Sequence, residues 1–154
     1  FDAAIHVGQP VWAGGVLEHL MDETVVPVAD PGFVGRHAIA APEDLATAPL
    51  IHQSTRPTAW ADWFGRVGVA SEAAWRGPRF DQFSMVAEAA AVGLGAALVP
   101  RFLVEEELAS GRLAVLFPQT LDTASAYFVV HPASKGRSAL LRAFEEWIVE
   151  EARG

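Results

Sequence analysis

Short apolar segments, separated by turn signals, run along the whole chain. Residues 1–7 begin with an alternation of apolar and polar side chains and end as an apolar run, which is typical of a strand. Further strands are predicted at residues 25–29, 50–53, 78–80, 112–117 and 126–131, and one closes the segment 79–100. A Gly/Pro loop, "GQPVWAGG", follows the first strand, and "DPG" at residues 30–32 ends the second. Residues 118–125 read as a connection.

A second period, of three to four residues, predicts helices between these strands. Around Trp60, Trp63, Phe64 and Val67 the apolar side chains are three, four and seven positions apart. A short helix is predicted to begin at Pro42, because proline suits the first helical position. Two more helices are expected after residues 82 and 100.

The two helices nearest the C-terminus are both predicted to be amphipathic. The helix in "RFLVEEELASG" has one apolar and one acidic face and is expected to end at Gly111. The last helix starts near Ser138. Its predicted buried stripe, opposite three glutamates, consists of Leu140, Leu141, Phe144, Trp147 and Ile148.

Strands that alternate with helices favour an α/β fold with mostly parallel sheets covered by helices. In such sheets, ligands bind at the carboxyl ends of the strands. Polar residues that directly follow a predicted strand are therefore the first candidates for a site.

The glycines of "RFDQFSMVAEAAAVGLGAALVP" are predicted to be structural. Gly93 and Gly95 superficially suggest a dinucleotide fingerprint, but that motif lies between a strand and the following helix. Here the glycines follow a helix and lead into a strand. Gly93 is expected to end the helix with a positive φ, and Gly95 to let helix and strand pass closely.

The other end of the same helix has polar residues directly after a strand. Gln82, Phe83 and Ser84 lie where backbone N–H groups are unpaired, so that a small anion or carboxylate could dock. The residues alone equally allow a purely structural interpretation, in which Asp81 is the N-cap and Phe83 belongs to the core.

Ser54 and Thr55 follow the predicted strand at residues 50–53. No G-x-S-x-G motif surrounds them, which argues against acyl transfer. They either cap the helix that contains Trp60 or contribute to a ligand site at its N–H-rich start, and the two roles are compatible.

The five histidines are dispersed, and no H-E-x-x-H motif or close pair is present. The sequence therefore predicts no metal site. His6 is kept as a candidate because it ends a strand next to Gly8, where a cleft would open.

The composition limits the function classes. The 154 residues are 51% hydrophobic, enough for one domain or two small lobes with a core. Eleven basic against 19 acidic residues give a net charge of −8, which opposes phosphate-backbone binding. The longest apolar run, residues 89–99, is too short for a membrane-spanning helix, which needs about 20 residues.

The absence of cysteine excludes disulfides and agrees with a reducing compartment. Phe1 opens inside a predicted strand and is not an initiator methionine, so we expect a fragment of a longer chain.

Six segments carry a resemblance to a known family. They are "FDAAIHVG", "LMDETVVPVADP", "DLATAPLIH", "TAWADWF", "FDQFSMVAEAAAVGLGAALVPRFLVEEELASGRLAVLF" and "AYFVVHP…LRAFEEWI". In this order they resemble the effector-binding domain of LysR-type transcriptional regulators, in the branch of the glycine-cleavage activator and the β-lactamase regulator. The strongest motif is F-D-x(7)-A-A-x-x-G-x-G-x-A-L-x-P, and "PLIH…W..W" marks the branch.

The resemblance implies a type-2 periplasmic-binding-protein-like α/β fold, with two Rossmann-like lobes joined by two crossover strands. Lobe one, regulatory subdomain I, would comprise residues 1–30 and 124–154 and would be incomplete. Lobe two, regulatory subdomain II, would comprise residues 31–123. The crossings would lie near residues 26–29 and 124–129, and the N-terminal winged helix-turn-helix and the linker helix would be absent.

The resemblance also implies the residues of an effector site. His6 stands where relatives usually carry arginine, which departs from the family pattern. The arginine of the 54–56 segment could pair with an anionic effector, or it could equally be an exposed arginine on the flank of a helix. The implied ligand-binding residues are Ser54, Thr55, Arg56, Gln82, Phe83, Ser84, Tyr127 and His6.

The implied function is sensing a small, anionic or amino-acid-like effector and passing the signal to a DNA-binding domain outside this chain. The expected protein is a cytoplasmic homodimer or homotetramer without enzymatic activity, cofactor, metal or membrane contact. DNA would be bound only through the absent N-terminal domain. The alternative is a periplasmic solute-binding protein of a transporter, which shares the fold. An upstream signal peptide would favour the transporter protein, whereas a basic helix-turn-helix would favour the regulator.

Overall fold

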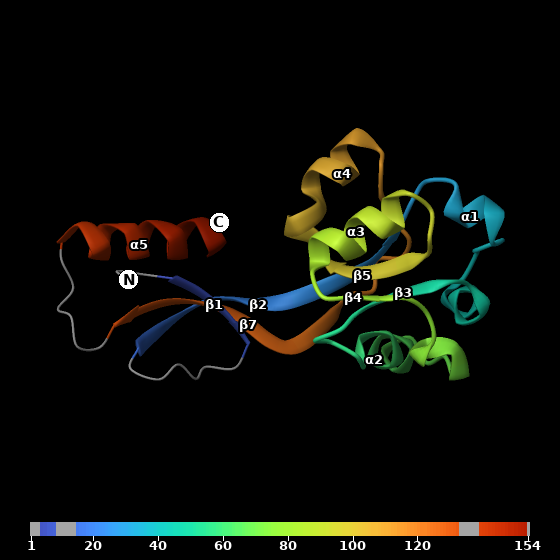
Figure 1. The fold of residues 1–154 in the computed structure, drawn as a ribbon, viewed down its shortest axis with the longest axis horizontal. Helices are drawn as coiled ribbons and strands as arrows, with labels where there is room; N and C mark the ends of the chain where they lie inside the picture. The colour runs from blue at the N-terminus through green and yellow to red at the C-terminus, as the bar shows by residue number, and fades with distance from the viewer. Residues whose placement is uncertain (1–3, 9–14, 133–138, 154) are drawn as a thin grey trace. The chain divides into compact units, whose positions relative to one another are not determined.

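The computed structural model describes residues 4–8, 15–132 and 139–153, and the chain divides into two compact units (Figure 1). Unit 1 comprises residues 1–23 and 122–154, and unit 2 comprises residues 24–121. Two strands, β2 (Gly15–Ala29) and β7 (Leu121–Pro132), contain the positions at which the chain passes from one unit to the other.

Unit 1 is built on antiparallel strands and one long helix. β1 (Ala4–Gly8) pairs with β7, with a register that sets Ala4 opposite Val130 and Gly8 opposite Ala126. β7 is in turn the neighbour of β2 in the sheet. α5 (Ala139–Arg153) buries Val149 against Leu20 of β2 and Val129 of β7.

Unit 2 has strand order β2-β5-β3-β4, with β6 on the other side of β2. β5 (Ala96–Pro100) and β6 (Ala114–Val115) run antiparallel to β2, whereas β3 (Leu50–Gln53) runs parallel to both β5 and β4 (Arg79–Phe80). The helices are α1 (Phe33–Arg36), α2 (Ala59–Arg66), α3 (Phe83–Ala91), α4 (Glu105–Ser110) and the 3₁₀ helices η1 (Pro42–Thr47), η2 (Glu72–Trp75) and η3 (Arg101–Val104).

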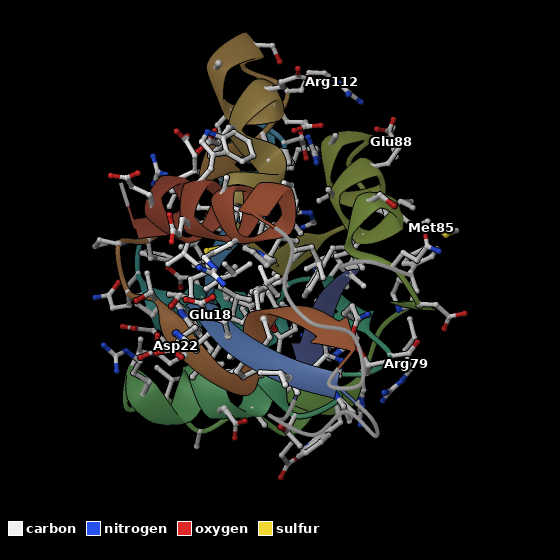
Figure 2. The ribbon with its side chains drawn as sticks, turned by 90° about the vertical axis from the view of Figure 1, so that its left-hand side faces the viewer. Glu18, Asp22, Arg79, Met85, Glu88 and Arg112 are labelled. Atoms are coloured by element: carbon white, nitrogen blue, oxygen red, sulfur yellow. The ribbon has the colours of Figure 1, made fainter. Side chains whose placement is uncertain are left out.

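Helices cover both faces of the sheet of unit 2. Figure 1 shows α3 and α4 on one side and α2 on the other. The α3 side buries Val86 and Ala90 against Ile51 and Val99. On its outer surface, Glu88 of α3 accepts two hydrogen bonds from Arg112 at 2.9 Å, and Met85 is exposed (Figure 2).

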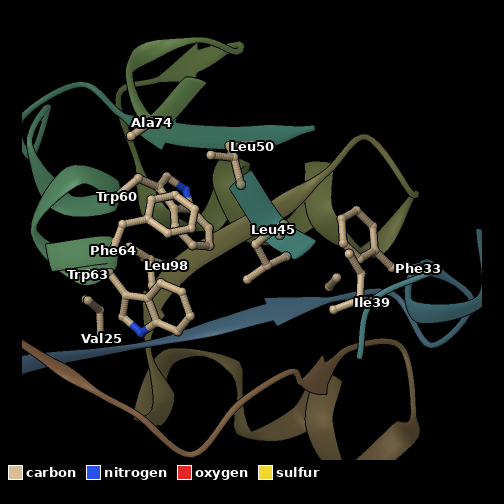
Figure 3. Close-up of a cluster of buried hydrophobic side chains, with 12 residues drawn as sticks. Val25, Phe33, Ile39, Leu45, Leu50, Trp60, Trp63, Phe64, Ala74 and Leu98 are labelled. Carbon is tan, nitrogen blue, oxygen red and sulfur yellow. The ribbon is translucent and has the colours of Figure 1, made fainter. Parts of the chain in front are cut away.

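On the α2 side of the sheet, the aromatic side chains of α2 form the centre of another buried hydrophobic cluster (Figure 3). Trp60 and Trp63 meet edge to face, with ring centroids 5.6 Å apart, and both are at most 1% exposed. Their indole N–H groups donate to the carbonyl oxygens of Ile51 and Gln119, each at 3.0 Å. The predicted stripe is thus confirmed, and the polar atom of each buried indole is satisfied.

Most short elements and both glycines of the 79–100 segment match the prediction. β3 has the predicted bounds, and Pro42 begins the predicted short helix, η1, which is a 3₁₀ helix. Gly93 follows Val92, the C-cap of α3, with φ +91°, and a Cβ on Gly95 would lie 2.8 Å from the Pro49 carbonyl oxygen. Gly111 ends α4 with φ +80°.

The two long strands and β6 differ from the prediction. β2 begins at Gly15, ten residues before the predicted start, and β7 includes residues 121–125, which read as a connection. Both extensions belong to antiparallel strands that have one solvated face. The polar residues on that face make the sequence resemble a loop, and only the pairing with a neighbouring strand identifies it as a strand. β6 is limited to the two residues that pair with Val28 and Ala29.

The burial predicted for the last two helices is partly wrong. Phe102 and Leu103 are exposed, and α4 buries none of its residues. In α5, Phe144 and Trp147 are exposed, whereas Val149 is buried. Ile148 of the predicted stripe does pack against the cluster of Leu20, Val129 and Val149, so the stripe is confirmed at this position and wrong at Phe144 and Trp147, because the contacting strands select the buried side. The side chains of Leu140 and Leu141 lie outside those that the structure describes. Ser138 lies outside the described residues.

Candidate functional site

The candidate site lies where the parallel strands β3 and β4 end in unit 2. Gln53, the last residue of β3, is in register with Phe80, the last residue of β4. The backbone N–H of Ser54 continues the pairing by donating to the Phe80 carbonyl oxygen at 2.9 Å. The segments 54–56 and 82–84 therefore leave the sheet side by side, at the edge where such sheets bind ligands.

Gln53 joins these two segments and was missed by the sequence reasoning. Gln53 is 7% exposed, and its Nε2 donates to the Asp81 carbonyl oxygen at 2.5 Å. Its Oε1 accepts from the backbone N–H and the hydroxyl of Thr55, at 2.8 and 2.6 Å. A polar amide at the end of an apolar strand was the signal that could have identified it, since buried amides require partners.

The Arg56 side chain contacts the first residue of α3, Phe83. Its guanidinium carbon is 4.6 Å from the centroid of the Phe83 ring, and its Nη1 donates to the Thr55 hydroxyl at 2.7 Å. The stacking holds the cation in place while the side chain stays half-buried. The arrangement presents a positive charge next to the N-terminal turn of a helix.

The first turn of α3 has no side-chain cap among the described residues. The N-cap is Gln82, in an extended conformation, so the alternative in which Asp81 caps the helix is wrong. Gln82 and Ser84 are exposed, and the Ser84 hydroxyl makes only a long 3.4 Å hydrogen bond to Gln82 Oε1. The positive end of the helix dipole therefore faces outward.

The alternative in which Ser54 or Thr55 caps α2 is also wrong. The N-cap of α2 is Thr58, which makes no capping hydrogen bond with its side chain. The Thr55 hydroxyl instead donates to Gln53, so this residue belongs to the loop that faces α3.

His52 lies directly behind this loop and is 2% exposed. Its Nε2 is 2.7 Å from the carbonyl oxygen of Arg76, to which a neutral imidazole can donate. Burial lowers the pKa of His52 below its usual value, so the ring is neutral at pH 7. It supports the site and adds no charge to it.

The two remaining candidates belong to unit 1 and do not lie together. The Tyr127 hydroxyl donates to Glu23 Oε2 at 2.9 Å. His6 is paired in register with Phe128, with ring centroids 6.0 Å apart. Since neighbouring strand residues face opposite sides, His6 and Tyr127 lie on opposite faces of the β1–β7 pair.

Two negative findings apply to the described residues. Residues 4–8, 15–132 and 139–153 hold no group of three His, Asp or Glu side chains placed to bind a metal ion. None of the helices in these ranges has the length and apolar character needed to cross a membrane.

The sequence matches the family described as LysR substrate binding domain over residues 1–153. It is 32% identical over 152 residues to the glycine cleavage system transcriptional activator of Escherichia coli K12, covering 98% of this chain and 50% of the relative. It is 34% identical over 161 residues to the HTH-type transcriptional regulator TrpI of Pseudomonas aeruginosa, covering 99% of this chain and 52% of the relative. The chain thus spans about half the length of the curated relatives it matches.

The fold is similar to that of solved effector domains. The effector domain of AmpR of Pseudomonas aeruginosa superposes with a TM-score of 0.87 at 27% identity, over 99% of this chain and 72% of that one. The AmpR effector binding domain of Citrobacter freundii gives a TM-score of 0.85 at 25% identity, over 99% of this chain and 74% of that one.

Proposed function

Because the chain belongs to the LysR substrate-binding domain family, we propose that it senses a small-molecule effector for a transcription regulator. Its fold is the predicted type-2 periplasmic-binding-protein-like α/β fold. The observation that carries the proposal is the convergence of residues 54–56 and 82–84 at the ends of β3 and β4, held by Gln53.

The chemistry of this edge favours an effector with an anionic group. Arg56 supplies a positive charge, and the first turn of α3 supplies backbone N–H groups at the positive end of a helix dipole. The exposed Ser84 adds a hydroxyl group, whereas the Thr55 hydroxyl already donates to Gln53. A carboxylate, whether of a small organic acid or an amino acid, matches these donors.

The rest of the predicted organisation is proposed with it. Units 1 and 2 would correspond to lobes one and two, and Tyr127 and His6 would be the contribution of lobe one to effector binding. The regulator would bind DNA through a region outside this chain, assemble as a homodimer or homotetramer, work in the cytoplasm and have no enzymatic activity. The relatives named above are transcription regulators, and no observation favours the transporter alternative.

A thermal-shift panel of free amino acids, small carboxylates and short peptides tests the proposal on the longest expressed form of the protein. A compound that binds the folded state stabilises it by RT ln(1 + [L]/Kd), so Tm rises with the logarithm of the compound's concentration once that exceeds Kd. Calorimetry then measures Kd for each compound that raises Tm.

Two arginine variants locate the binding. Arg56→Met is expected to raise the Kd of an anionic compound at least about tenfold, which is the effect of one lost charge-assisted hydrogen bond. Arg66→Met, at an exposed position in the last turn of α2, is the matched control and should leave Kd unchanged. A panel without any stabilising compound, or equal loss in both variants, would contradict the proposal.

A further inference from the structure

Glu23 of β2 is a fully buried acid in unit 1, with 0% of its surface exposed. Both carboxylate oxygens accept hydrogen bonds from β7. The Thr123 hydroxyl donates to Oε1 and the Tyr127 hydroxyl to Oε2, each at 2.9 Å. The partners are 100 and 104 residues away in sequence, so only the folded chain brings them together.

The partners of Glu23 lie on one face of β7. Residues 123, 125 and 127 alternate with their neighbours and therefore point to the same side of the strand. The backbone N–H of Ser125 donates to the Thr123 hydroxyl oxygen at 3.2 Å, and that hydroxyl donates onward to Glu23. The Glu23 carboxylate thus binds Thr123 and Tyr127 directly, and the Ser125 backbone is linked to it through the Thr123 hydroxyl.

Burying a carboxylate at this position costs more free energy than burying an apolar side chain. An ionised acid loses its hydration on burial and needs strong hydrogen bonds to compensate, whereas an apolar side chain would pack there without that cost. Hydrogen bonds to a charged acceptor are shorter and stronger than those between neutral groups, and they fix direction as well as distance. The acid is therefore suited to holding its two hydroxyl partners in one orientation.

The cluster also lies at the end of unit 1 on both strands. Glu23 is the last residue of unit 1 in β2, and Thr123 is the second residue of unit 1 in β7. Both passages to unit 2 therefore begin beside the same hydrogen-bonded group.

We propose that Glu23 is a positioning residue, which fixes the Tyr127 side chain and fastens β7 to β2 at the end of unit 1. This rests on the proposed function, in which Tyr127 contacts the effector. Glu23 itself acts through Tyr127 and does not bind the effector.

The test uses the vibrational signature of the tyrosine in UV resonance Raman spectra, which reports whether its hydroxyl donates a hydrogen bond. Tyr127 is the single tyrosine of this chain. In a longer form of the protein, the difference between wild type and Tyr127→Phe isolates its signal. The wild-type spectrum is expected to show a Tyr127 hydroxyl that donates a strong hydrogen bond. The signature should change in Glu23→Leu, which removes the acceptor. It should be intermediate in Glu23→Gln, because one of the two acceptor oxygens is replaced by an amide donor. Glu18→Gln, at an exposed position on the same strand, should match wild type.

A double-mutant cycle in urea gives an independent readout. Tyr127→Phe should lower the folding equilibrium constant at least about tenfold in wild type, and less than about threefold in the Glu23→Leu background. If Glu23→Leu does not fold, the cycle is run with Glu23→Gln. An unchanged tyrosine signal in both Glu23 variants, or additive losses in the cycle, would overturn the proposal. Neither measurement needs an effector, so a negative effector panel and a negative result here are distinguishable.

Discussion

Replacing Gln53 by leucine is expected to loosen the two segments of the candidate site together. The substitution keeps the approximate size of a 7% exposed side chain and removes its amide. It deletes the donor to the Asp81 carbonyl oxygen at 2.5 Å and the acceptor of two hydrogen bonds from Thr55. Both segments lose the group that joins them.

The magnitude follows from those three hydrogen bonds. Each contributes about 1 kcal/mol net, for a gross loss of about 3 kcal/mol. Burying an apolar side chain in place of the amide returns about 1 kcal/mol, and the exposed Thr55 and Asp81 can rebind water. The free energy of unfolding should therefore fall by about 2 kcal/mol.

Urea unfolding measures the change, with Gln119→Leu as the matched control. Gln119 is exposed, and only its backbone carbonyl accepts a structural hydrogen bond, from Trp63. The transition midpoint of Gln53→Leu should fall by about 1 M urea with the slope unchanged, given slopes near 2 kcal/mol per M. The midpoint of Gln119→Leu should move by less than about 0.25 M. Equal midpoints for Gln53→Leu and wild type would refute the assignment of Gln53 as the link between the segments.

Three further predictions concern the fold of unit 2. Burial lowers the pKa of His52, so the unfolded chain takes up a proton first and the free energy of unfolding should decline as pH falls below about 6.5. Urea midpoints measured from pH 8 to pH 5 should show a weaker decline in His52→Phe than in wild type, and an equal decline in both proteins would contradict this reasoning. The Arg36 guanidinium lowers the pKa of Asp30 through hydrogen bonds of 2.6 and 2.8 Å. The stability that this pair contributes is present above the unfolded pKa of Asp30, near 3.9, and is lost as pH falls through the lower pKa of the folded state. Asp30→Asn should therefore have a lower free energy of unfolding than wild type at pH 7, and the difference should disappear in acid. A Cβ on Gly77 would lie 1.9 Å from the Leu50 carbonyl oxygen at φ +126°, so Gly77→Ala should cost more than about 3 kcal/mol. Gly68→Ala, at φ +74° in open space, should cost about 1 kcal/mol, and equal costs for the two glycines would contradict the contact.

Local patterns were sufficient for much of unit 2. The three-to-four-residue spacing of Trp60, Trp63 and Phe64 identified α2 and its buried side. The order of strand, loop and helix placed Ser54 directly after β3 and the start of α3 shortly after β4, at the edge of the sheet where both are found. These features depend on residues a few positions apart, so the sequence itself contains the information.

Partners far apart along the chain could not be predicted from such patterns. Gln53 meets Asp81 28 residues away, and Glu23 meets Thr123 100 residues away, through contacts that only strand pairing creates. The buried side of α5 likewise depends on which strands it packs against, and Val149 is buried while Trp147 is exposed.

The sequence by itself therefore determined the α/β class, the family resemblance and the two segments of the candidate site. The tertiary structure decided which side chains hold those segments and which acid fixes Tyr127. The physical reason is that periodicity and turn chemistry act over one or two turns of chain. Hydrogen bonds of buried polar groups instead depend on the register of strands that are distant in sequence.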